Sequence, residues 1–257
     1  MRTRTLLALL PLAFSACKST ESALSTSALE RAQADADPHA RALAETVVVN
    51  LGGWQAWERT RYLQWSFFGG RRHTWDKATG DWRLDDGGNV VLMNVGTRAG
   101  RVFESGTEVF DAVRKKDLLD QAWGKWINDS YWMFLPWKLL DPGVKLRHLG
   151  AAALADGAPA QVLELTFEGV GLTPKNRYLV HVGDESGRIE QWAFFRDAGE
   201  EKPVFTLPWK GWKRVGRIQL CTDHGNLPGR ENTDWKIATP EELPRSVFTD
   251  PTAVQSP

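Results

Sequence analysis

The sequence predicts an exported α+β domain in which antiparallel strands and helices share one core. Two observations favour this class. Helical and two-residue periodicities follow one another as a helix, a β-meander, a long helix and a larger β-meander, without the strand–helix–strand units of a parallel sheet. The chain of 257 residues contains 13 Trp and 11 Phe and is 42% hydrophobic, which is enough for one sizeable core.

Residues 1–16 are typical of a signal peptide. Two arginines precede a short apolar run at 6–12, and two small residues precede Cys17. The apolar run is too short to span a bilayer. Small residues directly before a cysteine resemble the lipobox of bacterial lipoproteins, although Phe14 stands where that family usually has leucine. The resemblance implies that the signal is cleaved and that Cys17 carries the lipid. The alternative is an ordinary cleaved signal that leaves Cys17 free.

Residues 17–37 are rich in Ser, Thr, Ala and charge, and we expect them to form a flexible tether. The folded domain is then expected at 38–250, with a short C-terminal tail at 251–257. In the lipobox family the residue after the cysteine influences sorting. Lys18 therefore favours the periplasmic face of the outer membrane over the inner membrane or the cell surface.

The charge pattern and the motifs exclude several function classes. Basic and acidic residues number 32 each, so no basic surface for nucleic acid is expected. No phosphate loop, nucleophile elbow or paired metal ligands occur, which predicts neither a cofactor nor a resident metal. Cys221 is expected to be a small buried hydrophobe. The densest polar group is expected to be a solvated loop rather than a cation or acid–base site; it contains Asp223, His224, Glu231 and Asp234.

The first half of the domain begins with a helix. Apolar residues at three- and four-residue spacings predict a helix over 38–51, with Asp37 as N-cap and Pro38 in the first turn. Gly52 and Gly53 should end it. The period then changes to two, and turn-forming residues separate short strands. The expected strands are 61–68, 71–77, 81–85 and 89–95.

The second half begins with a long helix. Ser105 and Glu108 have the spacing of a capping box, and an apolar stripe continues to Ile127, so the helix should start at Ser105 and end near Pro136. The residues Asp141-Pro142-Gly143 have the order of a type II turn. Strands are expected at 144–149, 161–168, 176–182, 188–196, 203–207 and 212–221.

Several stretches together resemble an uncharacterised lipoprotein family whose fold is similar to LolA and LolB, the carriers and acceptors of lipoproteins. The resemblance covers about 40–250 and depends on turns and aromatic residues. These are Gly52-Gly53-Trp54 with Trp57, the run from Tyr131 to Leu139, Asp141-Pro142-Gly143-Val144, Leu243-Pro244, and Phe248-Thr249-Asp250-Pro251. It implies a strongly curved antiparallel sheet, about half of a barrel, with helices over its open side and an apolar cavity that holds acyl chains.

The aromatic surplus of the chain fits such a cavity, because tryptophan tolerates a boundary between apolar and wet surroundings. The alternative is that the rings fill a large solid core. If the cavity exists, we expect its lining from the first strand, the long helix and its end, and a later strand. The expected lining residues are Leu63, Trp65, Phe67, Trp123, Trp126, Trp132, Phe134, Trp137, Trp192 and Phe194.

The favoured function is a membrane-anchored envelope lipoprotein that binds a lipid or another hydrophobic ligand. Its expected partners are the membrane, through the N-terminal lipid, an acyl-chain ligand and an envelope protein. A scaffold lipoprotein with a solid core and an exposed docking patch is the first alternative. An enzyme of unknown class is the second, and it rests only on carboxylates and histidines that any domain of this size contains.

Overall fold

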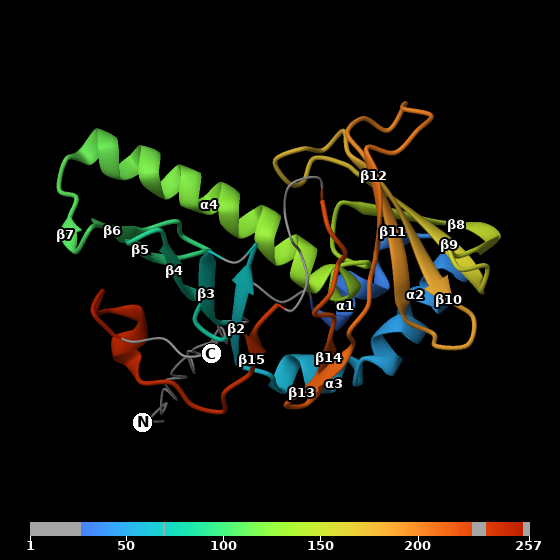
Figure 1. Ribbon diagram of the computed structural model, residues 1–257, viewed down its shortest axis with the longest axis horizontal. Helices are drawn as coiled ribbons and strands as arrows, with labels where there is room; N and C mark the ends of the chain where they lie inside the picture. Colours follow the sequence, from blue (N-terminus) through green and yellow to red (C-terminus); the bar gives the residue numbers. More distant parts are fainter. Residues whose placement is uncertain (1–26, 69, 228–234, 254–257) are drawn as a thin grey trace, which may run out of the picture.

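The computed structural model describes residues 27–68, 70–227 and 235–253. It is a mixed α+β structure with large antiparallel sheets and no closed barrel, so the predicted fold class is confirmed. The expected signal peptide and Cys17 lie outside the described residues. Figure 1 shows the long helix α4 (Ala112–Phe134) extending from the strands of one sheet to those of the other.

The first large sheet contains the first meander and has the strand order β15-β2-β3-β4-β5-β6-β7, with every neighbouring pair antiparallel. Four of the strands correspond to the predicted ones, and β6, β7 and β15 were not predicted. The bounds are β2 Tyr62–Phe67, β3 Arg71–Asp76, β4 Asp81–Asp86, β5 Asn89–Asn94, β6 Gly100–Glu104, β7 Thr107–Glu108 and β15 Ile237–Ala238.

The second large sheet has the order β1-β8-β9-β10-β11-β12 and is antiparallel except for the short β1–β8 pair. Its bounds are β1 Asp35–Ala36, β8 Val144–Ala153, β9 Pro159–Phe167, β10 Arg177–Gly183, β11 Ile189–Phe195 and β12 Phe205–Pro208. The strand expected at 212–221 is a separate hairpin of β13 (Lys213–Val215) and β14 (Ile218–Leu220).

The resemblance implied one curved sheet, whereas hydrogen bonding divides the strands between two. The reason lies in the connection between β7 and β8. It contains α4, whose 23 residues span about 35 Å at a rise of 1.5 Å per residue. Because the helix carries the chain from one end of the molecule to the other, the second meander starts far from the last strand of the first (Figure 1).

The N-terminal helices agree with the local sequence signals. α2 covers Pro38–Asn50, and the Asp37 side chain caps it by accepting a hydrogen bond from the Ala40 N–H at 2.8 Å. A further helix, α3 (Gly53–Arg59), begins at the second glycine and was not predicted. Part of the expected tether is folded: it forms α1 (Ala28–Ala32) and β1, which pairs with β8.

The predicted start of the long helix at Ser105 is wrong. Ser105 and Gly106 have positive φ angles of 49° and 83° and form the turn between β6 and β7. The N-cap is Asp111, whose side chain accepts a hydrogen bond from the Arg114 N–H at 2.8 Å. The end of the helix is as predicted, because α4 passes into the 3₁₀ turn η1 (Leu135–Trp137), which contains Pro136.

Both faces of the first sheet are covered. α4 lies on one face, and the C-terminal 3₁₀ turn η2 (Arg245–Phe248) contacts the other. The Arg83 guanidinium is buried in this second layer and donates hydrogen bonds to the carbonyls of Val247, Asp250 and Pro251. This explains why β2 is buried on both faces instead of alternating between core and solvent.

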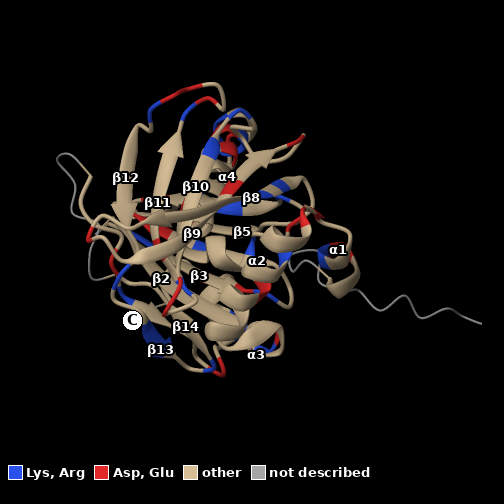
Figure 2. Cartoon of the chain, turned by 90° about the vertical axis from the view of Figure 1, so that its right-hand side faces the viewer, with Lys and Arg blue, Asp and Glu red and all other residues tan. Residues whose placement is uncertain are grey.

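Within the described residues no helix is both long and apolar enough to cross a membrane. On the side viewed in Figure 2, acidic and basic residues are interspersed over loops and strand ends. The equal numbers of acidic and basic residues in the chain agree with this mixture. Neither sign forms a continuous field on that face.

Candidate functional site

A pocket of about 540 Å³ lies between the C-terminal half of α4 and the second sheet. Its volume is within the usual range for small-molecule sites. The wall combines α4, the segment that follows it, five strands and the β9–β10 loop. The lining residues are Gly124, Trp126, Ile127, Asn128, Ser130, Tyr131, Trp132, Lys138, Asp141, Pro142, Val144, Phe167, Val170, Gly171, Leu172, Thr173, Asn176, Tyr178, Phe194 and Phe205.

One face of α4 forms the helical wall. Gly124, Ile127, Asn128 and Tyr131 are three or four residues apart, the spacing that aligns side chains along a helix. A glycine in a helix interior is destabilising by roughly 0.5–1 kcal/mol relative to alanine. At Gly124 the missing side chain leaves room, since a Cβ there would lie 3.7 Å from Cδ1 of Leu172. The local cost of glycine therefore falls at a point of the pocket wall where an added methyl group would make an ordinary van der Waals contact with Leu172.

A row of aromatic rings forms the opposite wall. Strand register places Tyr178 of β10 opposite Phe194 of β11, and Phe194 opposite Phe205 of β12. Successive ring centroids in this row are 5.3 Å and 5.2 Å apart. Across the pocket Tyr131 of α4 lies 5.6 Å from Tyr178, also between ring centroids. Helix and sheet therefore meet at the contact between Tyr131 and Tyr178.

The β9–β10 loop forms part of the rim. Leu172 in this loop lines the pocket and is 57% exposed. On the other side of the rim, Gly143 in the predicted turn has φ 81°, and its backbone approaches the Val170 side chain closely. The turn prediction is confirmed, because the Val144 N–H donates to the Asp141 carbonyl at 3.1 Å.

The interior of the pocket is electrically neutral. Burial raises the pKa of Tyr178 to about 12 and raises the pKa of Tyr131 well above its ordinary value. Both phenols therefore carry no charge at physiological pH. The lining contains one cation and one anion, Lys138 and Asp141, whose Nζ and Oδ2 atoms lie 3.4 Å apart. Such a site favours an apolar ligand over an ionic one.

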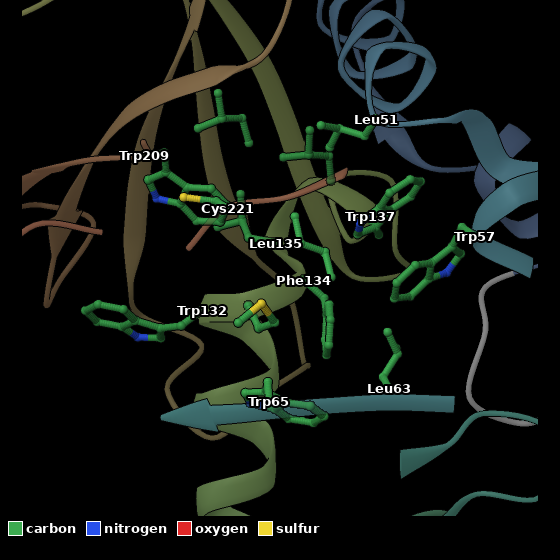
Figure 3. Close-up of a cluster of buried hydrophobic side chains, with 14 of the residues drawn as sticks. Leu51, Trp57, Leu63, Trp65, Trp132, Phe134, Leu135, Trp137, Trp209 and Cys221 are labelled. Atoms are coloured by element: carbon green, nitrogen blue, oxygen red, sulfur yellow. The ribbon is translucent and has the colours of Figure 1, made fainter. Parts of the chain in front are cut away.

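The structure places three of the ten expected lining residues on the pocket wall: Trp126, Trp132 and Phe194. Six others are in the packed core: Leu63, Trp65, Phe67, Phe134, Trp137 and Trp192. Figure 3 shows several of these with their side chains directed into one cluster. The tenth, Trp123, is half-buried with the Arg98 guanidinium 4.5 Å from its ring centroid.

The first-strand residues are away from the pocket because α4 packs directly on the first sheet. Trp65 stacks on His73 at 4.5 Å between ring centroids and contacts Phe134 edge to face at 5.0 Å. No room for a ligand remains between these rings. Several pocket residues were not predicted, among them Phe167, Tyr178 and Phe205. The alternation of the later strands was the signal that could have grouped them with Phe194.

A buried polar network fixes α4 to the first sheet beside the pocket. The Arg71 guanidinium donates two hydrogen bonds to the fully buried Asp129 carboxylate, at 2.7 Å and 2.9 Å. Nε2 of His73 lies 3.1 Å from the same carboxylate, and the Trp82 N–H donates to Nδ1 of His73 at 3.3 Å. Burial lowers the pKa of His73, so the ring is neutral and can accept from Trp82. The network positions the helix that forms one pocket wall.

The expectation of a solvated polar loop near the C-terminus is wrong for His224. His224 is fully buried between Trp209 and Trp235, with ring centroids at 4.4 Å and 4.2 Å. Asp223 accepts a hydrogen bond from the Gly225 N–H, whereas Glu231 and Asp234 lie outside the described residues. Cys221 is buried as expected, and burial raises the pKa of its thiol. Among the described residues no group of three or more potential metal ligands occurs.

No protein-family model and no curated protein sequence matches the chain. Distant solved structures do resemble it. A DUF1329 family protein from Desulfovibrio piger is 12% identical, and the match covers 81% of this chain and 96% of that chain at a TM-score of 0.40.

An outer membrane lipoprotein-sorting protein domain from Vibrio parahaemolyticus is 11% identical over 80% of this chain and 97% of that chain, at a TM-score of 0.32. A chain of the MucA/MucB complex from Pseudomonas aeruginosa is 15% identical, with 70% and 63% covered and a TM-score of 0.22. These neighbours include the LolA-like kind that the sequence resemblance named. The likenesses are distant and say nothing of the ligand of this chain.

Proposed function

We propose that this chain is an envelope lipoprotein that binds a lipid or another hydrophobic ligand in the pocket between α4 and the second sheet. The observation that carries the proposal is the aromatic, electrically neutral wall around about 540 Å³ of space. A hydrocarbon chain that leaves water for such a site gains about 0.8 kcal/mol per buried methylene group. Several methylene groups would therefore give substantial affinity without any charged contact.

The proposal includes anchoring through a lipid on Cys17 after removal of residues 1–16, and it places the domain on the periplasmic face of the outer membrane. An anchored protein cannot shuttle freely, so the role is that of an acceptor, a tethered transporter or a lipid-holding protein. Mass spectrometry of the protein extracted from membranes tests the anchor. Absence of diacylglycerol mass on Cys17 would reject it.

Ligand binding is tested with a Cys17→Ala variant that is delipidated and then titrated with cis-parinaric acid, a fluorescent fatty acid. We expect saturable binding of one molecule per chain. Asn128→Trp adds an indole at an exposed position of the pocket wall and should weaken binding by about tenfold or more, since tenfold corresponds to roughly 1.4 kcal/mol.

The matched control is Gln121→Trp, because Gln121 is exposed on the same side of α4, two turns before Asn128, and is not part of the lining. It should leave binding unchanged. Equal loss in both variants would show that the indole acts on the helix and not on the pocket. Lack of saturable binding in the parent protein would reject the proposed function.

Partner binding is a second candidate function. Phe110 and Val113, at the start of α4, are 80% and 72% exposed and lie at the opposite end of the helix from the pocket. Contiguous exposed apolar side chains mark contact sites on protein surfaces, and these two are three residues apart in the chain. Cross-linking from position 110 in intact cells, compared with position 121, tests this candidate. It is rejected if both positions give the same products.

A further inference from the structure

We propose that the pocket takes a lipid with one long hydrocarbon chain and excludes lipids with two full-length chains. This inference deepens the proposed function and rests on it. It commits to a ligand class that is smaller than a diacyl phospholipid or a triacylated lipoprotein. The observations that carry it are the volume of the pocket, the packing behind its inner wall and the charge balance of its lining.

Volume gives the first limit. A methylene group needs about as much room as a water molecule in the liquid, roughly 30 Å³, so a pocket of about 540 Å³ holds about 18 such groups. One long acyl chain fills that space. The two chains of an ordinary membrane phospholipid contain nearly twice as many methylene groups.

Close packing behind the inner wall leaves no room there for a second chain. Trp132 is buried and meets Trp192 edge to face at 4.7 Å between ring centroids. Trp126 has the same kind of contact with Trp75 at 4.9 Å. These spacings are those of rings in direct contact, so the space behind the wall is filled. To enlarge the pocket on this side, core rings would have to move.

The lining shows where the polar end of the ligand stays. The only charged lining residues that the structure describes are Lys138 and Asp141, which pair with each other. No uncompensated charge in the described wall is therefore available for an ionic headgroup. Asn128 and Thr173 line the pocket and are exposed, so a headgroup beside them would stay in contact with water. Affinity should depend on the chain, and added salt should change it little.

The test compares two lipids that share a headgroup. The delipidated Cys17→Ala protein is incubated with vesicles that contain equal amounts of palmitoyl lysophosphatidylcholine and dipalmitoyl phosphatidylcholine, and the adducts are weighed by native mass spectrometry. We expect a single lyso-lipid adduct, at least about tenfold more abundant than the diacyl adduct. Equal adducts would overturn the inference and leave the proposed function intact. Absence of both adducts would overturn the two together.

A second measurement uses saturated fatty acids of increasing length, each below its critical micelle concentration. Each added methylene should tighten binding by about fourfold until the pocket is full, after which the affinity should level off. Gly124→Leu adds a side chain of about four carbon atoms to the wall and should move this plateau to shorter chains by about the same number of methylene groups.

The matched control is Gln121→Leu, which adds an apolar side chain to an exposed site of the same helix outside the pocket. Its plateau should stay at the parental chain length. Circular dichroism verifies that both variants are folded. If Gly124→Leu folds and keeps the parental plateau, the α4 wall does not limit chain length and the inference is wrong.

Discussion

The two sides of α4 have similar chemistry and different packing. Toward the first sheet, the helix presents Asp129 and Met133 to a closely packed layer, and Trp126, which also borders the pocket, packs on Trp75. Toward the second sheet, Tyr131 and Ile127 face aromatic residues across a pocket of about 540 Å³. An aromatic composition therefore does not by itself produce a cavity. The difference is that the ion pair between Arg71 and Asp129 holds α4 against the first sheet. The helix contacts the second sheet only near the C-terminal end of α4.

Removing the ion pair between Arg71 and Asp129 is the strongest test of why α4 packs closely against the first sheet. Asp129→Ala leaves the Arg71 guanidinium and His73 without their shared partner in a buried site, and we expect a loss of roughly 3–5 kcal/mol in the free energy of unfolding. Urea denaturation measures this loss. Asp120→Ala is the control, because its exposed pair with Lys116 is screened by solvent and should contribute little to stability. Similar losses in the two variants would contradict the special role of the buried pair.

Acid should destabilise the packing of His224 between Trp209 and Trp235. Burial lowers the pKa of His224 to about 3, so the folded protein resists a proton that the unfolded chain accepts near its ordinary value. The stabilising contribution of neutral His224 to the folded state is therefore fully present above about pH 6.5 and is lost as the pH falls toward the folded-state pKa. The loss should reach roughly 3 kcal/mol by about pH 4.

Urea midpoints measured at several pH values test this expectation. His224→Phe keeps a ring between Trp209 and Trp235 but cannot be protonated, so its stability should vary less with pH. An equally steep fall in the variant would assign the acid sensitivity to other groups. His73, whose pKa burial also lowers, is the first of these to examine.

Side-chain truncation should distinguish the solid side from the open side. Leu63→Ala removes a fully buried side chain of the first sheet and should cost about 3 kcal/mol. Phe194→Ala removes a larger side chain, but this ring is half-buried and faces the pocket, so fewer contacts are lost and about 1–2 kcal/mol is expected. A greater loss for Phe194→Ala than for Leu63→Ala would indicate that the pocket wall is packed as tightly as the core.

The smallest effect concerns the turn at the rim. Gly143 has φ 81°, and a Cβ atom there would lie 2.4 Å from Cγ1 of Val170. Gly143→Ala should therefore destabilise the protein by roughly 1–2 kcal/mol, through both strain and displacement of the loop. Gly87 also has a positive φ but faces open space, so Gly87→Ala measures the strain alone. Equal unfolding midpoints for the two variants would show that Val170 yields without cost.

Local signals in the sequence determined most element boundaries. The Asp37 cap, the Pro38 start and the break at Gly52 describe α2 correctly, because caps and breakers act within a few residues. The capping-box pattern at Ser105 failed for the same local reason. Ser105 and Gly106 adopt left-handed conformations in the turn after β6. The true N-cap is Asp111, and the third helical position is Arg114, so the sequence has no capping-box glutamate there.

The sequence by itself determined the antiparallel α+β class and the supply of aromatic side chains, since periodicity and composition are properties of the chain alone. Only the tertiary structure decided which rings fill the core and which enclose space. Trp65 and Phe194 both lie in segments whose sequence alternates with a period of two. α4 packs directly against Trp65, whereas the pocket separates α4 from Phe194. That choice depends on the orientation of one helix between two sheets, which is fixed by contacts such as Arg71 with Asp129 that join residues far apart in the chain.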